Sequence, residues 1–173
     1  STILHAGIPP LMNSAYNTAD ILVVVLDNRI IAASGHPPGP NIGITQTGKE
    51  TKSISIEDVV GSLNLDYVKL VDPFDLQNTI NVMEEALRTP GQRVVISRSD
   101  CACASRKKAE YKGITLKKYE VTASCVGCKI CATQIGCPPI FWRDSHSNID
   151  PVICVGCGLC AQMCPVFAIK LRE

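Results

Sequence analysis

The chain has 173 residues, enough for one ordinary domain or two small ones. Its residues are 46% hydrophobic and its formal net charge is +1, which suits a globular protein with a core and argues against a disordered chain or a basic nucleic-acid-binding protein. We therefore expect no nucleic acid among the partners. No apolar run approaches the roughly 20 residues of a membrane span, so we expect no membrane partner either.

The amino terminus reads Ser-Thr-Ile-Leu-His, without an initiator methionine and without a signal region of positive charge followed by apolar residues. We interpret the chain as a fragment of a longer polypeptide and predict a cytoplasmic location. Ten cysteines in a chain without an export signal indicate metal ligation rather than disulfide bonds.

The first hundred residues alternate between helical and strand patterns. Residues 8–17 predict a helix entered through Pro9 and Pro10, where proline is tolerated. Residues 21–27 form a valine-rich run, which predicts a strand buried on both faces. Strands at 66–72 and 93–98 follow.

Two more helices separate these strands. Residues 53–65 offer Ser55 as N-cap, with Asp58 three residues later, and residues 75–89 begin at the capping residue Asp75. The second of these helices has apolar residues at helical spacing, namely Ile80, Met83, Ala86 and Leu87. The alternation predicts an α/β fold with an open, doubly wound parallel sheet covered by helices.

Two segments interrupt this pattern. Residues 35–52 are rich in Gly and Pro, and they leave the carboxyl end of the first strand, where open α/β sheets bind ligands. Residues 101–118 predict a linker or an exposed helix that is either simply solvated or able to attract an acidic electron carrier. This stretch carries the basic residues Arg106, Lys107, Lys108, Lys112, Lys117 and Lys118.

Eight of the ten cysteines stand in two repeated motifs after residue 118. Each motif has three cysteines at intervals of three residues, followed by a Cys-Pro pair. The spacing of the second motif is that of bacterial ferredoxins with two 4Fe-4S clusters, in which each Cys-Pro cysteine ligates the other cluster. We therefore predict one cluster held by Cys125, Cys128, Cys131 and Cys164, and a second held by Cys154, Cys157, Cys160 and Cys137.

Other readings of the motifs are weaker. Structural zinc uses pairs of ligands, so triplets would leave thiols unused. We expect Gly127 and Gly156 to allow close backbone approach, and Phe141 and Trp142 to shield the clusters. Candidate strands lie at 118–122 and 167–171, with a hairpin at 140–150 and a short helix behind each cluster.

Cys101 and Cys103 fall outside the motifs. They are either small packed residues at a strand end or part of an accessory redox site.

The first half resembles a known family. The segment STILHAGIPPLMNSAYNTADILVVVLDNR is similar to the cofactor-binding segment of thiamine-diphosphate enzymes, whose opening Gly-Asp would precede Ser1. Together with SGHPP (34–38) and SIEDVV (55–60), it resembles the alpha subunit of indolepyruvate:ferredoxin oxidoreductases. The resemblance spans essentially the whole chain. It implies a thiamine-diphosphate-binding domain at 1–117, including a linker at 101–117, and a small α+β ferredoxin-like domain at 118–173.

The resemblance also implies the site. Asn28 and the carbonyl of Ile30 would bind Mg²⁺, while Ser1 and Thr2 at a helix N-terminus would bind the diphosphate of thiamine diphosphate. His5 and His36 are candidate catalytic residues that would orient substrate or move protons, or alternatively would only complete hydrogen bonds.

The implied reaction is oxidative decarboxylation of arylpyruvates such as indolepyruvate to acyl-coenzyme A, with electrons passing through two 4Fe-4S clusters to external ferredoxin. The implied partners are the rest of the alpha chain and a smaller beta subunit. We expect the fragment alone to be inactive and to bind thiamine diphosphate weakly. The alternatives are an oxidoreductase for pyruvate, 2-oxoglutarate or branched-chain oxoacids, and a non-catalytic electron-transfer subunit with a scaffold domain.

Overall fold

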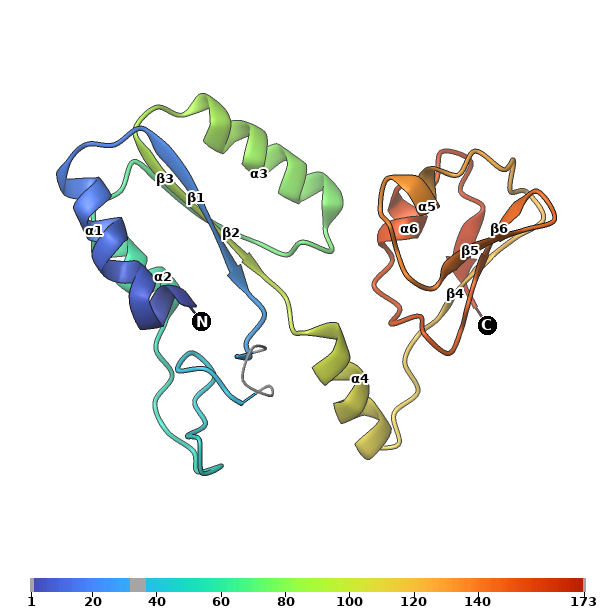
Figure 1. The fold of residues 1–173 in the computed structure, drawn as a ribbon, viewed down its shortest axis with the longest axis horizontal. Coiled ribbons are helices and arrows are strands. Elements are labelled where there is room, and N and C mark those ends of the chain that lie inside the picture. The colour runs from blue at the N-terminus through green and yellow to red at the C-terminus, as the bar shows by residue number, and fades with distance from the viewer. Residues whose placement is uncertain (1, 32–36, 173) are drawn as a thin grey trace. The chain divides into compact units, whose positions relative to one another are not determined.

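A computed structural model describes residues 2–31 and 37–172 of the chain. The chain divides into two compact units, Ser1–Ala104 and Ser105–Glu173 (Figure 1). The predicted domain boundary after residue 117 stays a prediction. No helix in the described residues is long and apolar enough to cross a membrane.

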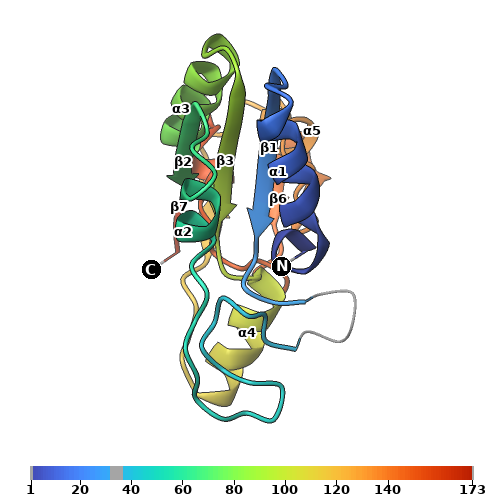
Figure 2. The same cartoon turned by 90° about the vertical axis from the view of Figure 1, so that its left-hand side faces the viewer.

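The first unit contains a three-stranded parallel sheet. Its strands are β1 (Ile21–Asp27), β2 (Tyr67–Val71) and β3 (Gln92–Arg98), in the order β1-β3-β2, and Figure 2 shows β3 between its two neighbours. Because β3 is paired on both sides and covered on both faces, its residues Val94, Val95 and Ile96 are at most 1% exposed. The parallel sheet confirms the predicted α/β class.

Helices cover both faces of this sheet (Figure 1). On one face, α1 (Ile8–Tyr16) and α2 (Ile56–Gly61) pack Leu11, Ile56 and Val60 against Val25, Val94 and Ile96. On the other face, α3 (Leu76–Arg88) packs Ala86 against Tyr67, Val71 and Val95.

The two predicted helix caps are confirmed. The side chain of Ser55 accepts a hydrogen bond from the Asp58 amide, and the side chain of Asp75 accepts one from the Asn78 amide. Each cap satisfies a backbone N–H group that has no partner within its helix.

One packing prediction was wrong. β1 is not buried on both faces: the alternate residues Val24 and Leu26, which share one face, are 40% and 74% exposed. In α3, Ile80 and Leu87 are also exposed, and the buried stripe runs through Ala86 with Val82 and Met83 beside it. The sequence reading also missed η1 (Ile3–Gly7), a π-helical segment that leads into α1.

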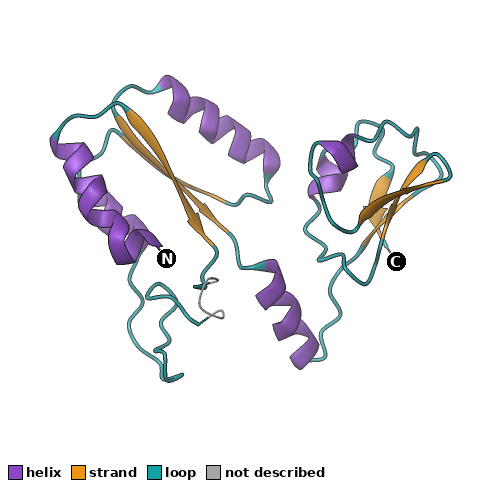
Figure 3. Cartoon of the chain, in the orientation of Figure 1, coloured by secondary structure: helices purple, strands orange, loops and turns teal. Residues whose placement is uncertain are grey.

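Helix α4 (Ala102–Tyr111) occupies most of the basic stretch at 101–118. The second unit then folds as short strands and helices, which Figure 3 distinguishes by colour. The structure confirms both candidate strands, β4 (Tyr119–Val121) and β7 (Ile169–Leu171), and pairs them antiparallel. It also confirms the predicted hairpin, formed by β5 (Ile140–Arg143) and β6 (His146–Ile149). It also shows a short helix within each cysteine motif, α5 (Ile130–Thr133) and α6 (Leu159–Gln162).

Candidate metal centres

Four cysteines from both motifs line one pocket in the second unit. They are Cys125, Cys128, Cys131 and Cys164. The remaining wall is largely apolar and includes Val121, Val126, Val166 and Ile169, with Lys129 and Ser147 beside the cysteines. The first triplet therefore meets the Cys-Pro cysteine of the second motif, which is the grouping that we predict for one cluster.

The other four cysteines also influence one another. Burial, followed by the charges of Cys157, Cys137 and Cys154, raises the pKa of the Cys160 thiol to about 11. Burial likewise raises the pKa of Cys137, followed by the charges of Cys157, Cys154 and Cys131. Cys137 thus lies close to the second triplet. Four neighbouring thiolates repel one another, so they require a cationic centre to hold them in the ionised form.

The chemistry of these donors fits an iron–sulfur cluster. All ten cysteines are free of disulfide bonds. Within residues 2–31 and 37–172, no three His, Cys, Asp or Glu side chains are placed to hold one metal ion. A cubane cluster takes four thiolates around its outside, so its ligands line a pocket instead of converging on a point. The assignment of each cysteine to a cluster stays a prediction.

Glycines let other backbone segments approach the cysteine loops. Gly127 has φ +70, and a Cβ there would lie 2.6 Å from the carbonyl oxygen of Ser145. Gly156 has φ +74, and a Cβ there would collide with the backbone carbonyl of Lys117. The close approach predicted for both glycines is present, and the partner is the β5–β6 turn in one case and the segment before β4 in the other.

Polar groups surround the cysteines at short range. The Ala168 amide donates to Cys164 Sγ over 3.2 Å, and Ser147 Oγ lies 3.3 Å from Cys131 Sγ. The ammonium group of Lys118 donates to the carbonyl oxygen of Cys154. Hydrogen bonds and charges near the sulfurs are the means by which a protein sets a cluster's potential.

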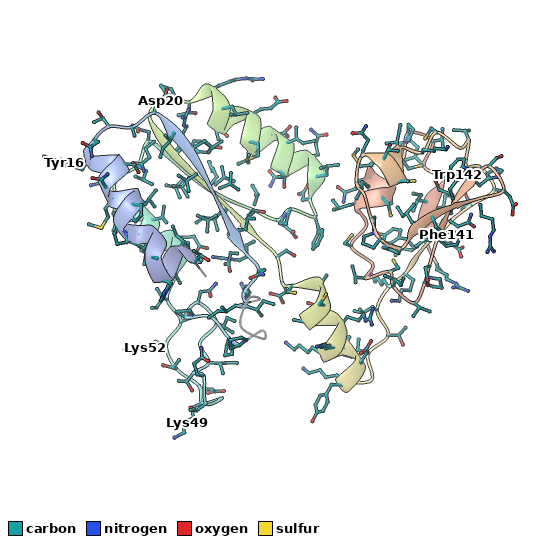
Figure 4. All side chains as sticks on the ribbon, viewed as in Figure 1. Tyr16, Asp20, Lys49, Lys52, Phe141 and Trp142 are labelled. Carbon is teal, nitrogen blue, oxygen red and sulfur yellow. The ribbon has the colours of Figure 1, made fainter. Side chains whose placement is uncertain are left out.

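The prediction that Phe141 and Trp142 form a buried shield was wrong. Phe141 is 42% and Trp142 39% exposed on β5, where Figure 4 labels them. The Trp142 ring edge lies against Gly127, and its face receives the ammonium group of Lys129 at 4.6 Å from the ring centroid. The Trp142 ring thus covers the outside of the first cysteine loop and remains accessible to solvent.

The predicted Mg²⁺ ligands lie in one turn after β1. Asn28 Oδ1 accepts a hydrogen bond from the Ile30 amide over 3.2 Å, so Asn28 and Ile30 share a tight loop. Side-chain and carbonyl oxygens are the ligands that Mg²⁺ prefers, and the donor set therefore fits a diphosphate-bound cation. The amide of Cys101 donates to the Asn28 carbonyl at the same place, while Cys103 is exposed.

There are four other predicted site residues. Ser1 and His36 lie outside the described residues. Thr2 is an exposed residue at the N-terminus of η1, and its side chain makes no capping hydrogen bond. His5 is exposed on η1. The catalytic roles of His5 and His36 stay predictions.

The sequence analysis missed a buried ionic network behind this turn. Asp27, 1% exposed, accepts from Arg98 Nε over 2.7 Å, and Arg98 also binds both carboxylate oxygens of Glu57, at 2.5 and 2.7 Å. The Arg98 hydrogen bond lowers the pKa of Glu57, and the Glu57 hydrogen bond raises that of Arg98. The available signal was that each of two strands with an apolar centre ends in a charged residue, Asp27 in β1 and Arg98 in β3.

Comparison with known proteins agrees with this geometry. A family model for the 4Fe-4S binding domain matches residues 148–170. Pyruvate synthase subunit PorD of Methanothermobacter marburgensis is 35% identical over 70 residues, which are 40% of this chain and 83% of that protein. The second unit is therefore a ferredoxin-like domain that binds 4Fe-4S clusters.

The similarity of the whole chain is more specific. Indolepyruvate oxidoreductase subunit IorA of Thermococcus kodakarensis is 40% identical over 173 residues, and that of Archaeoglobus fulgidus is 38% identical over 172, in each case 98% of this chain. The chain belongs to the IorA family, and it spans 27% of the length of these relatives. No solved structure matches the chain.

Proposed function

We propose that the chain is the electron-transferring part of a 2-oxoacid:ferredoxin oxidoreductase, in which two 4Fe-4S clusters pass electrons from substrate oxidation to external ferredoxin. The observation that carries this proposal is the pocket lined by Cys125, Cys128, Cys131 and Cys164, because it joins both cysteine motifs around one space. Low-potential clusters of this type suit the strong reductant that oxoacid decarboxylation generates.

The proposed substrate is an arylpyruvate, with indolepyruvate as the type compound and coenzyme A as the acyl acceptor. Support comes from the relatives, which are named indolepyruvate oxidoreductase subunits. Thiamine diphosphate, when bound, would supply the electron sink for decarboxylation. In this chain Asn28 Oδ1 and the Ile30 carbonyl would hold its Mg²⁺, and Thr2 would contribute to the diphosphate site.

Buried side chains of this chain stabilise the turn that contains Asn28 and Ile30. Asp27 also accepts a hydrogen bond from the Arg29 amide over 3.1 Å, so the buried carboxylate orients the backbone between Asn28 and Ile30. Arg98 fixes Asp27 in turn. Ligand oxygens held by a rigid second layer need little rearrangement when the cation binds.

The remaining parts of the enzyme are proposed as partners: the rest of the alpha chain, a smaller beta subunit and ferredoxin. The proposal includes a cytoplasmic location. The exposed basic residues of α4 and the following linker, which are Lys107, Lys108, Lys112 and Lys117, would favour an acidic electron carrier.

The test begins with the full oxidoreductase complex purified without oxygen. We expect acid-labile sulfide, two clusters per chain by iron analysis, and ferredoxin reduction that is faster with indolepyruvate than with pyruvate. A colourless or zinc-containing preparation would end the electron-transfer proposal. Faster turnover of pyruvate would end only the substrate assignment.

A second candidate is an electron-transfer subunit whose α/β unit is only a scaffold. The similarity of 40% of the chain to PorD, which is named a subunit of pyruvate synthase, favours it. This candidate predicts no thiamine diphosphate in the purified complex, whereas the enzyme proposal predicts about one per alpha chain. Cofactor analysis of the denatured complex separates the two.

A further inference from the structure

Ser147 is a buried polar residue on β6, in the hairpin between the two cysteine motifs. It is 3% exposed, while its neighbour His146 is exposed. Its partner across the hairpin is Trp142. Side chains alternate along a strand, so the position of Ser147 faces the interior. A buried hydroxyl in such a place needs a hydrogen-bond partner.

The partner is a cluster cysteine. Ser147 Oγ lies 3.3 Å from Cys131 Sγ, and both residues line the pocket shared with Cys125, Cys128 and Cys164. As a thiol, Cys131 donates to the hydroxyl oxygen. A cysteine that ligates iron is a thiolate and has no proton to give. With the cluster bound, the same contact requires the serine hydroxyl to be the donor.

We propose that Ser147 sets the reduction potential of the cluster held by Cys125, Cys128, Cys131 and Cys164. Reduction adds one electron to this cluster, and the added negative charge spreads onto its sulfurs. A hydroxyl that donates to the Cys131 thiolate stabilises the reduced form more than the oxidised form, and so raises the potential. The step moves one electron, and Ser147 keeps its proton throughout.

The surroundings strengthen this effect. The pocket wall is apolar around Val121, Val126 and Ile169, and a hydrogen bond is electrostatically stronger in such a medium than in water. The Ala168 amide donates to Cys164 Sγ in the same pocket, so the hydroxyl adds to a backbone donor that side-chain substitution leaves in place. Ser147 is therefore the part of this environment that mutation can remove selectively.

The inference rests on the iron–sulfur part of the proposed function. The experiment uses the full chain purified without oxygen, with stepwise reduction by dithionite followed by electron paramagnetic resonance. For Ser147→Ala we expect one of the two one-electron steps to move to more negative potential. The expected change is about tenfold in its equilibrium constant, which corresponds to about 59 mV for a one-electron couple. The other step should stay in place as an internal control.

Two further comparisons separate tuning from packing. Ser147→Thr and Ser147→Val have nearly the same shape and differ in the hydroxyl, so only the Val variant should show the negative shift. Ser145→Ala changes an exposed serine of the same hairpin and should leave both potentials unchanged.

The outcomes are distinguishable. Equal potentials in the Thr and Val variants, or equal shifts of both clusters, would overturn the role of Ser147. Absence of iron from the unsubstituted chain would instead overturn the proposed function. If Ser147→Ala loses a cluster, the Thr and Val pair decides the question.

Discussion

Asn41 Nδ2 donates to Asp27 Oδ1 over 2.7 Å. This hydrogen bond joins the Gly- and Pro-rich segment at 35–52 to the carboxyl end of β1, where the sequence analysis predicts a ligand site. The same carboxylate receives Arg98 on its other oxygen. One buried acid thus fixes a strand end, a neighbouring strand and a loop.

Replacing Arg98 by methionine should destabilise the chain by about 3–5 kcal/mol, because it leaves the Asp27 carboxylate buried without its cation. Urea unfolding measures the change. Arg88→Met is the control: Arg88 is 79% exposed and pairs with Glu84 on the surface of α3, so less than about 1 kcal/mol should be lost. Similar losses in the two variants would show that the buried network contributes no more than a surface pair.

Paired cysteine substitutions test which ligands share a cluster. Cys125→Ala combined with Cys164→Ala should remove one cluster and leave half of the iron, since the structure places both residues in one pocket. Cys125→Ala combined with Cys137→Ala should disturb both clusters and lose nearly all of the iron. Iron analysis after anaerobic purification reads the result. The reverse order would mean that each motif ligates its own cluster.

Gly156→Ala should prevent binding of the cluster predicted at the second cysteine triplet, Cys154, Cys157 and Cys160. The alanine Cβ would meet the Lys117 backbone carbonyl, and φ at this position is +74, so the cysteine loop must shift. Gly136→Ala is a matched control, because Gly136 has φ +62 but open space around its Cβ position. We expect half of the iron in the first variant and full iron in the second. Full iron in both would show that the loop tolerates the displacement.

Ionisation of the Tyr67 hydroxyl should lower the free energy of unfolding at alkaline pH. Burial and the hydrogen bond to Glu85 raise the pKa of Tyr67 from 10.0 to about 12. The unfolded chain therefore releases this proton first, so the stabilisation is complete below pH 10 and is lost as the pH rises from 10 to about 12. In Tyr67→Phe this part of the pH dependence should vanish.

The measurement for Tyr67 is the free energy of unfolding across that pH range, taken as the difference between variant and parent. Tyr111→Phe serves as the control, since Tyr111 is 93% exposed. A difference for Tyr67→Phe that does not change with pH would contradict the assigned pKa.

Much of the fold was predictable because local signals and packing agree. The caps at Ser55 and Asp75, the valine-rich β1 and the hairpin at 140–150 each have a local physical cause in the sequence. The exposure of Leu26 was not predictable, because burial of a strand depends on its place in the sheet. The apolar periodicity of α3 likewise could not show whether Ile80 or Val82 is the more buried, because that depends on the position of β2.

The candidate sites likewise contain residues that the sequence could predict and residues that it could not. Cysteine spacing is a strong signal because cluster geometry dictates it, and the pocket brings together four of the predicted ligands. Ser147 and Arg98 could not be assigned from sequence, because their partners Cys131 and Asp27 lie 16 and 71 residues away. Long-range polar pairs of this kind carry no periodic pattern.

The outer side of β1 has a practical consequence for any work on the isolated chain. Within the described residues β1 pairs only with β3, so one row of its backbone amides and carbonyls has no strand beside it, and Val24 and Leu26 are exposed along the same strand. Such an edge is a template for joining two molecules. Samples for spectroscopy should therefore be kept dilute, and their light scattering should rise with concentration.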